Sequence, residues 1–493
     1  MSEYDVAIVG YGPVGAVLGL LLKEQGVSTL IIDRDTEVQK FPRAAHFDDE
    51  IVRMLQAVGL GHLSDAWENP PRYQYFDAEW KPFLARLFPA GISELGYKYD
   101  FMFFQPDLER SLRARLAEGT GAPTVLLGHE VLGIRQDADG VDLEERDLAT
   151  GEVTTHRAKW LVGADGASSI VRKSMATTFE QLAESYQWYV VDIRLTGDAD
   201  PCADQWEFCD PERIVTYVPL SCPYRRFEFD VKPGESQADL GTPEKTWELL
   251  SPWLKPDEAE ILRNDIYRFH SLLADRWRDG RVLIAGDAAH LMTPKLGQGL
   301  CTGIRDVANL SWKLGRVVRG QAGPELLDSY EAERKAPARQ YIEISAHMVS
   351  MIVQKASGED GEKEVVEQIV AGRQKLGDDS ARAHDELIGT LSRQPVLADG
   401  SRMDDSLGWR FALLATAELA DALTPADLSA LVALGAVVLR ADDPAIADYL
   451  ADVQRGAILL RPDRYIAGTA TTAGELGALL ESAAATSAAL SSV

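Results

Sequence analysis

The first residues of the chain show the pattern of a strand, a helix and a second strand. Residues 4–9 form a short apolar run that ends at glycine, which is typical of a buried strand. Residues 13–25 have helical spacing, and residues 28–33 predict a second strand. A βαβ unit has about 30 residues, so this segment predicts the opening unit of an α/β fold.

The middle of the chain predicts mainly strands. Residues 72–104 are rich in aromatic residues, prolines and glycines, whereas residues 106–116 return to helical spacing. Residues 124–162 predict a β-meander with a turn near Asp139-Gly140. Apolar and polar positions alternate in residues 186–230, so we expect an antiparallel sheet with one face over a pocket.

The last third of the chain returns to helices and then changes in composition. Residues 281–320 predict strand, loop and helix, and residues 326–355 predict a long helix with a kink at Pro337. The charged residues 357–385 predict an exposed helix or linker.

From about residue 395 a separate small α/β domain is expected. Its predicted strands are residues 411–415, 436–439 and 457–460, and the Ala/Ser-rich residues 483–493 predict a frayed tail.

Charge and composition exclude several classes of partner. The 493 residues carry a net charge of −27, and an acidic surface repels phosphate backbones and anionic lipids. We therefore expect no nucleic acid and no membrane as partner. The apolar residues 14–22 are too few to span a bilayer, which needs about 20 residues, so a cytoplasmic protein is expected.

The four cysteines predict neither a disulfide framework nor a metal centre. Cys202, Cys209, Cys222 and Cys301 form no CxxC pair and no zinc-type spacing with histidine. Free thiols are the simplest interpretation, and no bound metal is expected.

A glycine loop follows the first strand: Gly10-Tyr11-Gly12-Pro13-Val14-Gly15. In such a loop the first glycine permits the tight turn, the second lets a pyrophosphate approach, and the third allows close helix–strand packing. The phosphates would lie at a helix N-terminus, which favours anions. Asp33 ends the second strand, where a carboxylate can accept ribose hydroxyls. The loop predicts dinucleotide binding without separating FAD from NAD.

A second segment places glycines after a buried strand. Residues 281–285 deliver Gly286 and Asp287 at the carboxyl end of the strand, where ligands of α/β proteins bind. Pro294 and then Gly297-Gln298-Gly299 precede a helix. The exposed N–H groups of such a turn can stabilise negative charge on a reduced flavin.

Together these motifs resemble those of the class A flavoprotein monooxygenases, the aromatic-hydroxylase family. The glycine loop, Asp165-Gly166 and Gly286-Asp287 occur in the family's order within residues 4–345. Pro42-Arg43-Ala44 with His46-Phe47-Asp48-Asp49-Glu50, and Gln105-Pro106, are most similar to the 3-(3-hydroxyphenyl)propionate hydroxylase branch.

This resemblance implies an α/β fold with three parts. A Rossmann-like FAD-binding domain of the glutathione-reductase type (residues 1–72, 105–178 and 275–355) would interleave with a substrate-binding β-sheet domain (residues 73–104 and 179–274). A helical linker (residues 356–394) and a thioredoxin-like C-terminal domain (residues 395–493) would follow. The last domain lacks a CxxC pair, so a structural or associative role is expected for it.

The resemblance also implies roles for residues at the cofactor. Asp33 would hold the adenosine ribose, Arg43 and Gln105 the flavin end, and Asp287 the ribityl-pyrophosphate region. Asp165 and Arg172 would belong to a motif linked to FAD and NAD(P)H. The alternatives are a surface charge for Arg172, a helix-start residue for Gln105 and a plain turn for Asp165-Gly166. The expected cofactor contacts are Gly10, Gly12, Pro13, Val14, Gly15, Asp33, Arg34, Arg43, Gln105, Asp165, Gly286, Asp287, Pro294, Gly297, Gln298, Gly299 and Leu300.

The chain departs from the family pattern beside the expected isoalloxazine. Lys295 puts a charge where the family often has an apolar residue, and Cys301 replaces the usual Asn. Lys295 either binds an anionic group of the substrate or the reduced flavin, or it points to solvent. The expected catalytic residues are His46, Pro294 and Lys295.

Two further assignments each have an alternative. His46 is the first candidate for deprotonating the substrate, and a core histidine is the alternative. Trp188, Tyr189 and Tyr217 are expected to line the substrate pocket, and a plain aromatic core is the alternative.

The implied activity is an FAD-dependent monooxygenase. It would use NADH or NADPH and O2 to hydroxylate a small phenolic substrate through a C4a-hydroperoxyflavin, and a homodimer is the assembly that the family suggests. The alternatives are a polyketide-type aromatic hydroxylase acting on a larger polycycle and a non-catalytic FAD-binding protein. A flavin-dependent halogenase is disfavoured because the sequence has no Trp-x-Trp-x-Ile-Pro motif.

Overall fold

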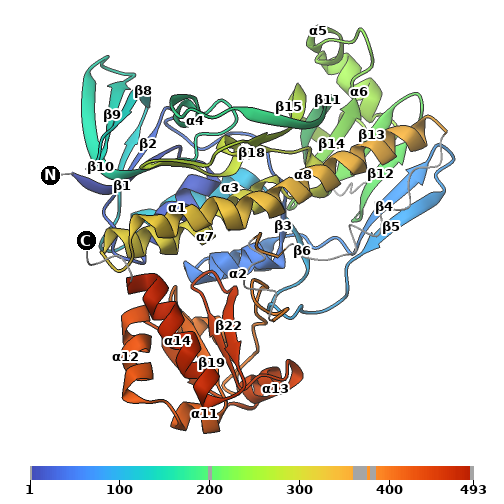
Figure 1. Cartoon of the computed structure of the whole chain (residues 1–493). Coiled ribbons are helices and arrows are strands. Elements are labelled where there is room, and N and C mark those ends of the chain that lie inside the picture. Colours follow the sequence, from blue (N-terminus) through green and yellow to red (C-terminus); the bar gives the residue numbers. More distant parts are fainter. Residues whose placement is uncertain (1–2, 198–202, 359–374, 378–384, 489–493) are drawn as a thin grey trace.

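The fold is built on two eight-stranded sheets and the helices that pack against them (Figure 1). This computed structural model describes residues 3–197, 203–358, 375–377 and 385–488. A smaller four-stranded sheet forms a separate C-terminal unit. The fold is mixed α/β, as the sequence predicts. None of the helices in these ranges is long and apolar enough to cross a membrane.

The first sheet has a parallel centre. Its order begins β16-β17-β10-β1-β2-β7, and β8 and β9 extend it beside β10. The strands are β1 (Tyr4–Val9), β2 (Thr29–Asp33), β7 (Thr124–Leu127), β8 (His129–Gln136), β9 (Val141–Asp147), β10 (Val153–Gly163), β16 (Arg278–Asp279) and β17 (Val282–Ile284). Since β1 pairs in parallel with β2 and β10, and β10 with β17, their carboxyl ends meet at one edge.

Helices cover this sheet because their apolar faces match its buried strands. The predicted βαβ unit is confirmed. The predicted β-meander is confirmed for β8, β9 and β10, whereas β7 pairs in parallel with β2 and lies outside it. Helices α1 (Pro13–Lys23), α3 (Gln105–Ala117) and α7 (Gly299–Val318) pack around one core with the strands. Leu18, Ile31 and Ile304 in this core are fully buried.

The second sheet has the order β18-β15-β11-β14-β13-β12-β4-β5. Its strands are β4 (Arg72–Asp77), β5 (Pro82–Leu87), β11 (Phe179–Leu195), β12 (Gln205–Cys209), β13 (Ile214–Val218), β14 (Tyr224–Asp230), β15 (Ala259–Ala274) and β18 (His290–Leu291). An apolar cluster on one face includes residues of α5 (Gln237–Leu240) and α6 (Pro243–Leu250). Helix α8 (Asp328–Ala356) packs against other residues of the sheet and continues through Pro337.

A separate two-stranded sheet joins segments that are far apart in the sequence. Strand β3 (His46–Asp48) pairs with β6 (Asp100–Met102) and leads into α2 (Asp49–Ala57). The Asp48 carboxylate accepts a hydrogen bond from the Ile51 N–H at 3.2 Å, which caps α2. In Figure 1, α2 lies between α7 and the C-terminal unit.

The C-terminal unit has the sheet order β20-β19-β21-β22. Its elements are α10 (Met403–Leu407), β19 (Ala412–Ala415), α11 (Ala417–Asp421), α12 (Pro425–Leu434), β20 (Val437–Arg440), α13 (Pro444–Asp452), β21 (Ala457–Leu460), β22 (Ile466–Ala470) and α14 (Ala473–Ala488). The three strands predicted from the sequence are present, and β22 adds a fourth.

One expectation for this unit was wrong. Helix α14 continues to Ala488, so the frayed tail does not begin at Ala483. Residues 489–493 and most of residues 357–385 lie outside the described residues, as does Cys202.

Candidate cofactor and substrate site

A cavity of about 960 Å³ runs from the carboxyl edge of the first sheet to the second sheet. This volume is near the upper end of the range of about 300–1,000 Å³ for ligand pockets. The cavity touches the glycine loop, the loop after β17 and strands of the second sheet. Its lining includes Gly10, Gly12, Asp33, Arg43, Asp287, Pro294, Gly297, Leu300, Val190, Thr216 and Val218.

The glycine loop has the geometry that a bound pyrophosphate requires. Gly10 has a φ of +104°, and a Cβ there would lie 2.3 Å from the Ala164 carbonyl oxygen. A Cβ on Gly15 would lie 2.0 Å from the Gly10 oxygen, whereas a Cβ on Gly12 would meet nothing within 4 Å. Because Gly12 lines the cavity, its open side faces the space available to a ligand.

The N-terminus of α1 is open to an anion. No side chain caps this end of the helix, and its first turn contains no acidic residue. The first N–H groups of a helix lack intrahelical partners, and the helix dipole favours negative charge there. The loop and α1 together therefore fit a dinucleotide's phosphates.

Asp33 is held rigidly at the same edge. One carboxylate oxygen accepts from the Tyr11 N–H at 2.5 Å, and the other accepts from the Asp35 N–H at 2.8 Å. Each carboxylate oxygen can accept a second hydrogen bond. Asp33 and Arg34 both line the cavity, so Asp33 fits the expected contact with ribose hydroxyls.

Asp165 organises a turn of its own. Its carboxylate accepts from the Ser169 hydroxyl at 2.5 Å and from the Ile170 N–H at 2.7 Å, at the start of α4 (Ile170–Ser174). Burial raises the pKa of Asp165, although these hydrogen bonds oppose the shift. Arg172 donates to the carbonyl oxygens of Ala167 and Ala288 at 2.7 and 3.0 Å, which ties this turn to the loop after β17.

Asp287 follows β17 and projects into the cavity. Its side chain is exposed there, yet the surrounding protein raises the pKa of Asp287 by desolvation, against the charges of His290 and Arg43. Gly286 has a φ of +60°, and a Cβ on it would lie 3.2 Å from Val14. The loop after β17 thus lies directly against the glycine loop.

Gln105 shapes the loop that carries Arg43. Its side-chain oxygen accepts from the N–H groups of Arg43 and Ala44 at 2.8 and 2.7 Å, and its amide donates to Glu109 at 2.7 Å. The Arg43 side chain remains exposed and lines the cavity. Gln105 therefore holds the loop backbone, and both Gln105 and Arg43 line the cavity.

His46 supports the loop of residues 297–300, which is named the flavin loop here because the sequence predicts that it lies beside the isoalloxazine. Its Nε2 lies 2.5 Å from Asp100 and its Nδ1 lies 3.0 Å from the Gly297 oxygen. Burial disfavours the imidazolium, but the charge and hydrogen bond of Asp100 outweigh this effect and raise the pKa of His46 well above its ordinary value. A charged imidazole with both N–H groups engaged favours a positioning role over proton abstraction from a substrate.

Lys295 is buried rather than solvent-exposed. Its ammonium lies 3.2 Å from Glu207 and 3.3 Å from Glu228, donates to the Thr216 hydroxyl, and sits 3.6 Å from the centre of the Trp188 ring. Tyr73 also donates to Glu207, at 2.9 Å. Two carboxylates thus balance the Lys295 charge, which disfavours a role as receptor for an anionic substrate.

The aromatic residues expected in the pocket divide between two faces of the second sheet. Val190, Thr216 and Val218 line the cavity, whereas Tyr189 and Tyr217 belong to the apolar cluster that includes residues of α6. Successive residues of a strand point to opposite faces. The expectation for Tyr189 and Tyr217 is therefore corrected to the core alternative, and Trp188 contacts Lys295.

Sequence reasoning missed the acids of this sheet. Glu207 and Glu228 are buried at 0% and 3% exposure, and each lies in a buried strand between two aromatic residues. An acid in such a strand needs a buried partner. The unusual Lys295 and the two acids in buried strands could together have predicted these ion pairs from the sequence.

Comparison with known proteins identifies the family. The sequence profile of the family described as FAD binding domain matches residues 3–345. The chain belongs to this FAD-binding family. It is 38% identical over 345 residues to the 3-(3-hydroxy-phenyl)propionate/3-hydroxycinnamic acid hydroxylase of Comamonas testosteroni, a match over 70% of this chain and 58% of that protein. The match thus spans less than two thirds of that relative's length.

Solved structures share the fold across nearly the whole chain. Aklavinone-11 hydroxylase in complex with FAD and aklavinone has a TM-score of 0.80 at 24% identity, covering 98% of this chain and 99% of that one. The flavin-dependent monooxygenase PieE has a TM-score of 0.81 at 22% identity, covering 99% and 100%. The C-terminal unit is therefore part of the shared fold.

Gly12, which precedes α1, and Gly15, in its first turn, give a matched test of the cofactor site. Gly12→Ala is expected to leave the melting temperature of the apoprotein nearly unchanged but to weaken FAD binding about tenfold or more, because its methyl group enters the ligand space. Gly15→Ala should lower the stability of the apoprotein by about 1–3 kcal/mol through overpacking. Thermal unfolding and FAD titration distinguish them, and equal FAD affinity in Gly12→Ala and wild type would contradict the placement.

Lys295→Met should destabilise the protein by about 3–5 kcal/mol at neutral pH, because it leaves buried carboxylates unpaired. Burial already raises the pKa of Glu207, and the Lys295 charge opposes that shift. Without Lys295 the folded pKa rises further above the unfolded value, so the variant should regain stability as pH falls. Urea unfolding across the pH range measures this.

The double variant Lys295→Met/Glu207→Gln is the control for this charge effect. It should recover part of the lost stability at neutral pH and show a weaker pH dependence. A loss that is independent of pH in Lys295→Met would show that packing, not charge, dominates at this position.

Proposed function

We propose that this protein is an FAD-dependent monooxygenase that uses NADH or NADPH and O2 to hydroxylate a small phenolic substrate. The carrying observation is the single cavity, which joins the dinucleotide edge of the first sheet to the face of the second sheet carrying Val190, Thr216 and Val218. The 38% identity to a hydroxylase of phenolic acids supports the substrate class.

The protein's own part in this reaction is to bind and orient. The open N-terminus of α1 and the glycine loop hold phosphates, and Asp33 accepts ribose hydroxyls. Asp287 and Arg43 line the same cavity. When bound, FAD supplies the redox chemistry with NAD(P)H and O2.

The flavin loop lines the cavity together with the preceding Pro294. Gly297, Gly299 and Leu300 of the loop face this space, and the imidazolium of His46 holds the Gly297 carbonyl. A fixed wall at this place would position a flavin ring against the sheet that receives the substrate. Burial of the second sheet's cavity face would exclude water from the reacting atoms.

The domain division follows the same proposal. Residues 1–72, 105–178 and 275–355 would form the FAD-binding domain, and residues 73–104 and 179–274 the substrate domain. The four-stranded C-terminal sheet with flanking helices supports a thioredoxin-like domain at residues 395–493. We further propose a cytoplasmic homodimer that binds neither nucleic acid nor membrane, in keeping with the net charge of −27.

The test is a screen of phenolic acids and polycyclic phenols against the FAD-loaded protein. A small phenol should stimulate NADH or NADPH oxidation and gain one oxygen atom, as seen by mass spectrometry. Stimulation by polycyclic phenols alone would favour the larger-substrate alternative. FAD binding without stimulation by any phenol would indicate a non-catalytic FAD protein and would overturn the proposal.

A pair of variants tests whether the substrate binds at the cavity face of β13. Val218→Phe narrows the cavity and should raise the KM for the phenol about tenfold or more, since even one methylene in a pocket is worth about 1–3 kcal/mol. Val215→Ile, on the opposite face of the strand, should leave KM unchanged. Equal KM values for the two variants would contradict this placement.

A further inference from the structure

A buried chain of polar contacts connects the C-terminal unit with the flavin loop. The Tyr465 hydroxyl, just before β22, donates to Glu50 on α2 at 2.9 Å. Arg305 on α7 donates to the other Glu50 oxygen at 2.8 Å and to the side-chain oxygen of Gln298 at 2.8 Å. Tyr465, Glu50 and Arg305 are only 4%, 2% and 3% exposed. This series of hydrogen bonds therefore connects Tyr465 with Gln298 of the flavin loop through buried residues alone.

Gln298 is fixed at both ends of its amide. Its oxygen accepts from Arg305, and its nitrogen donates to the Asp48 carboxylate at 3.1 Å. Arg305 also pairs with Asp48, which caps α2. Because Gln298 is the residue before α7 and lies between Gly297 and Gly299, these contacts set the backbone of the flavin loop.

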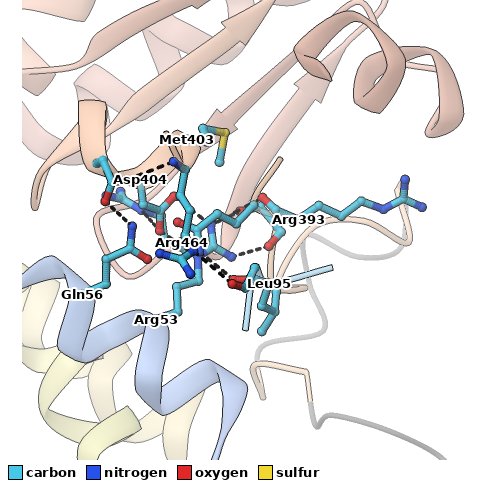
Figure 2. Close-up of polar contacts among 12 residues, drawn as sticks. Arg53, Gln56, Leu95, Arg393, Met403, Asp404 and Arg464 are labelled. Atoms are coloured by element: carbon cyan, nitrogen blue, oxygen red, sulfur yellow. Dashed lines mark hydrogen bonds and ion pairs between the residues drawn. The ribbon is translucent and has the colours of Figure 1, made fainter. Parts of the chain in front are cut away.

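The C-terminal unit is held firmly enough to transmit this constraint. Arg53 on α2 donates to both oxygens of Asp404 at 2.7 and 3.0 Å, and Arg464, which precedes Tyr465, pairs with the same carboxylate at 3.1 Å (Figure 2). Gln56 donates to Asp405 at 2.5 Å. Figure 2 shows these contacts between α2 and the C-terminal unit.

We propose that the C-terminal unit positions the flavin loop through Tyr465, Glu50, Arg305 and Gln298, with Tyr465 as the positioning residue that links the two parts. This inference rests on the proposed function, in which the flavin loop faces FAD. The hydroxyl of Tyr465 shares Glu50 with Arg305. Removing this hydroxyl leaves one Glu50 oxygen without its donor. Arg305 can then shift toward that oxygen, which alters its contacts with Asp48 and Gln298.

The burial and the Glu50 charge raise the pKa of Tyr465 well above its ordinary value. Tyr465 therefore stays a protonated donor throughout the physiological range. The link acts as a fixed support and not as a switch that titrates with pH.

The experiment compares Tyr465→Phe with two matched variants of the full-length protein. Tyr449→Phe removes a hydroxyl of similar burial. This hydroxyl accepts from the Arg393 N–H at 3.3 Å, and neither residue belongs to the series of contacts that leads to Gln298. Trp312→Phe removes a contact of α7 with Asp463 at 3.1 Å that is not part of the chain to Gln298. For each protein we would measure apoprotein melting, the dissociation constant for FAD and the visible absorption spectrum of bound FAD.

Tyr465→Phe is expected to raise the FAD dissociation constant about threefold or more and to shift the spectrum of bound FAD. A threefold change corresponds to a loss of about 0.7 kcal/mol of binding free energy. Both controls should stay close to wild type in these two measurements, whatever their melting temperatures. A Tyr465→Phe variant that matches the controls in affinity and spectrum would overturn the inference alone. A wild-type protein that does not bind FAD would overturn the proposed function as well.

Discussion

The close approach of three backbone segments at the carboxyl edge of the parallel sheet is the constraint on which the rest of the structure depends. A Cβ on Gly10 would lie 2.3 Å from the Ala164 oxygen, and a Cβ on Gly286 would lie 3.2 Å from the Val14 side chain. The three motifs recognised in the sequence are therefore parts of one contact region. This contact leaves the N-terminus of α1 open at one end of a cavity whose other end is the second sheet.

Buried charges then fix the loops around that cavity. Arg305 lies between Asp48 and Glu50, Lys295 lies between Glu207 and Glu228, and Arg226 and Arg263 share Asp192. Taking such ions out of water costs free energy that their attraction only partly offsets. Their effect is to hold a particular geometry: the first set orients Gln298, and the third binds the Pro42 carbonyl of the Arg43 loop. Cavity shape thus depends on ion pairs as well as on apolar packing.

The sequence predicted the parts of this site that are local. The glycine loop, Asp33 and the strand before Gly286 each follow from a few neighbouring residues, and the structure has them as expected. The face of Tyr189 and Tyr217 could not be read in the same way, because a shift of one residue in a strand reverses every side chain. Tyr465 and Glu50 are 415 residues apart in the sequence. Their contact depends on how the C-terminal unit packs against α2, which no local sequence pattern predicts. Lys295 is unusual in the sequence, but its buried position depends on Glu207 and Glu228, which come from two strands distant in the chain.

An experimental structure with FAD bound tests the central claim most directly, namely that one cavity arranges the cofactor between the glycine loop and the second sheet. The account predicts the pyrophosphate at the N-terminus of α1 beside Gly12, and the isoalloxazine against the flavin loop, facing Val190, Thr216 and Val218. A flavin ring bound away from residues 297–300, or a pyrophosphate away from the glycine loop, would contradict it.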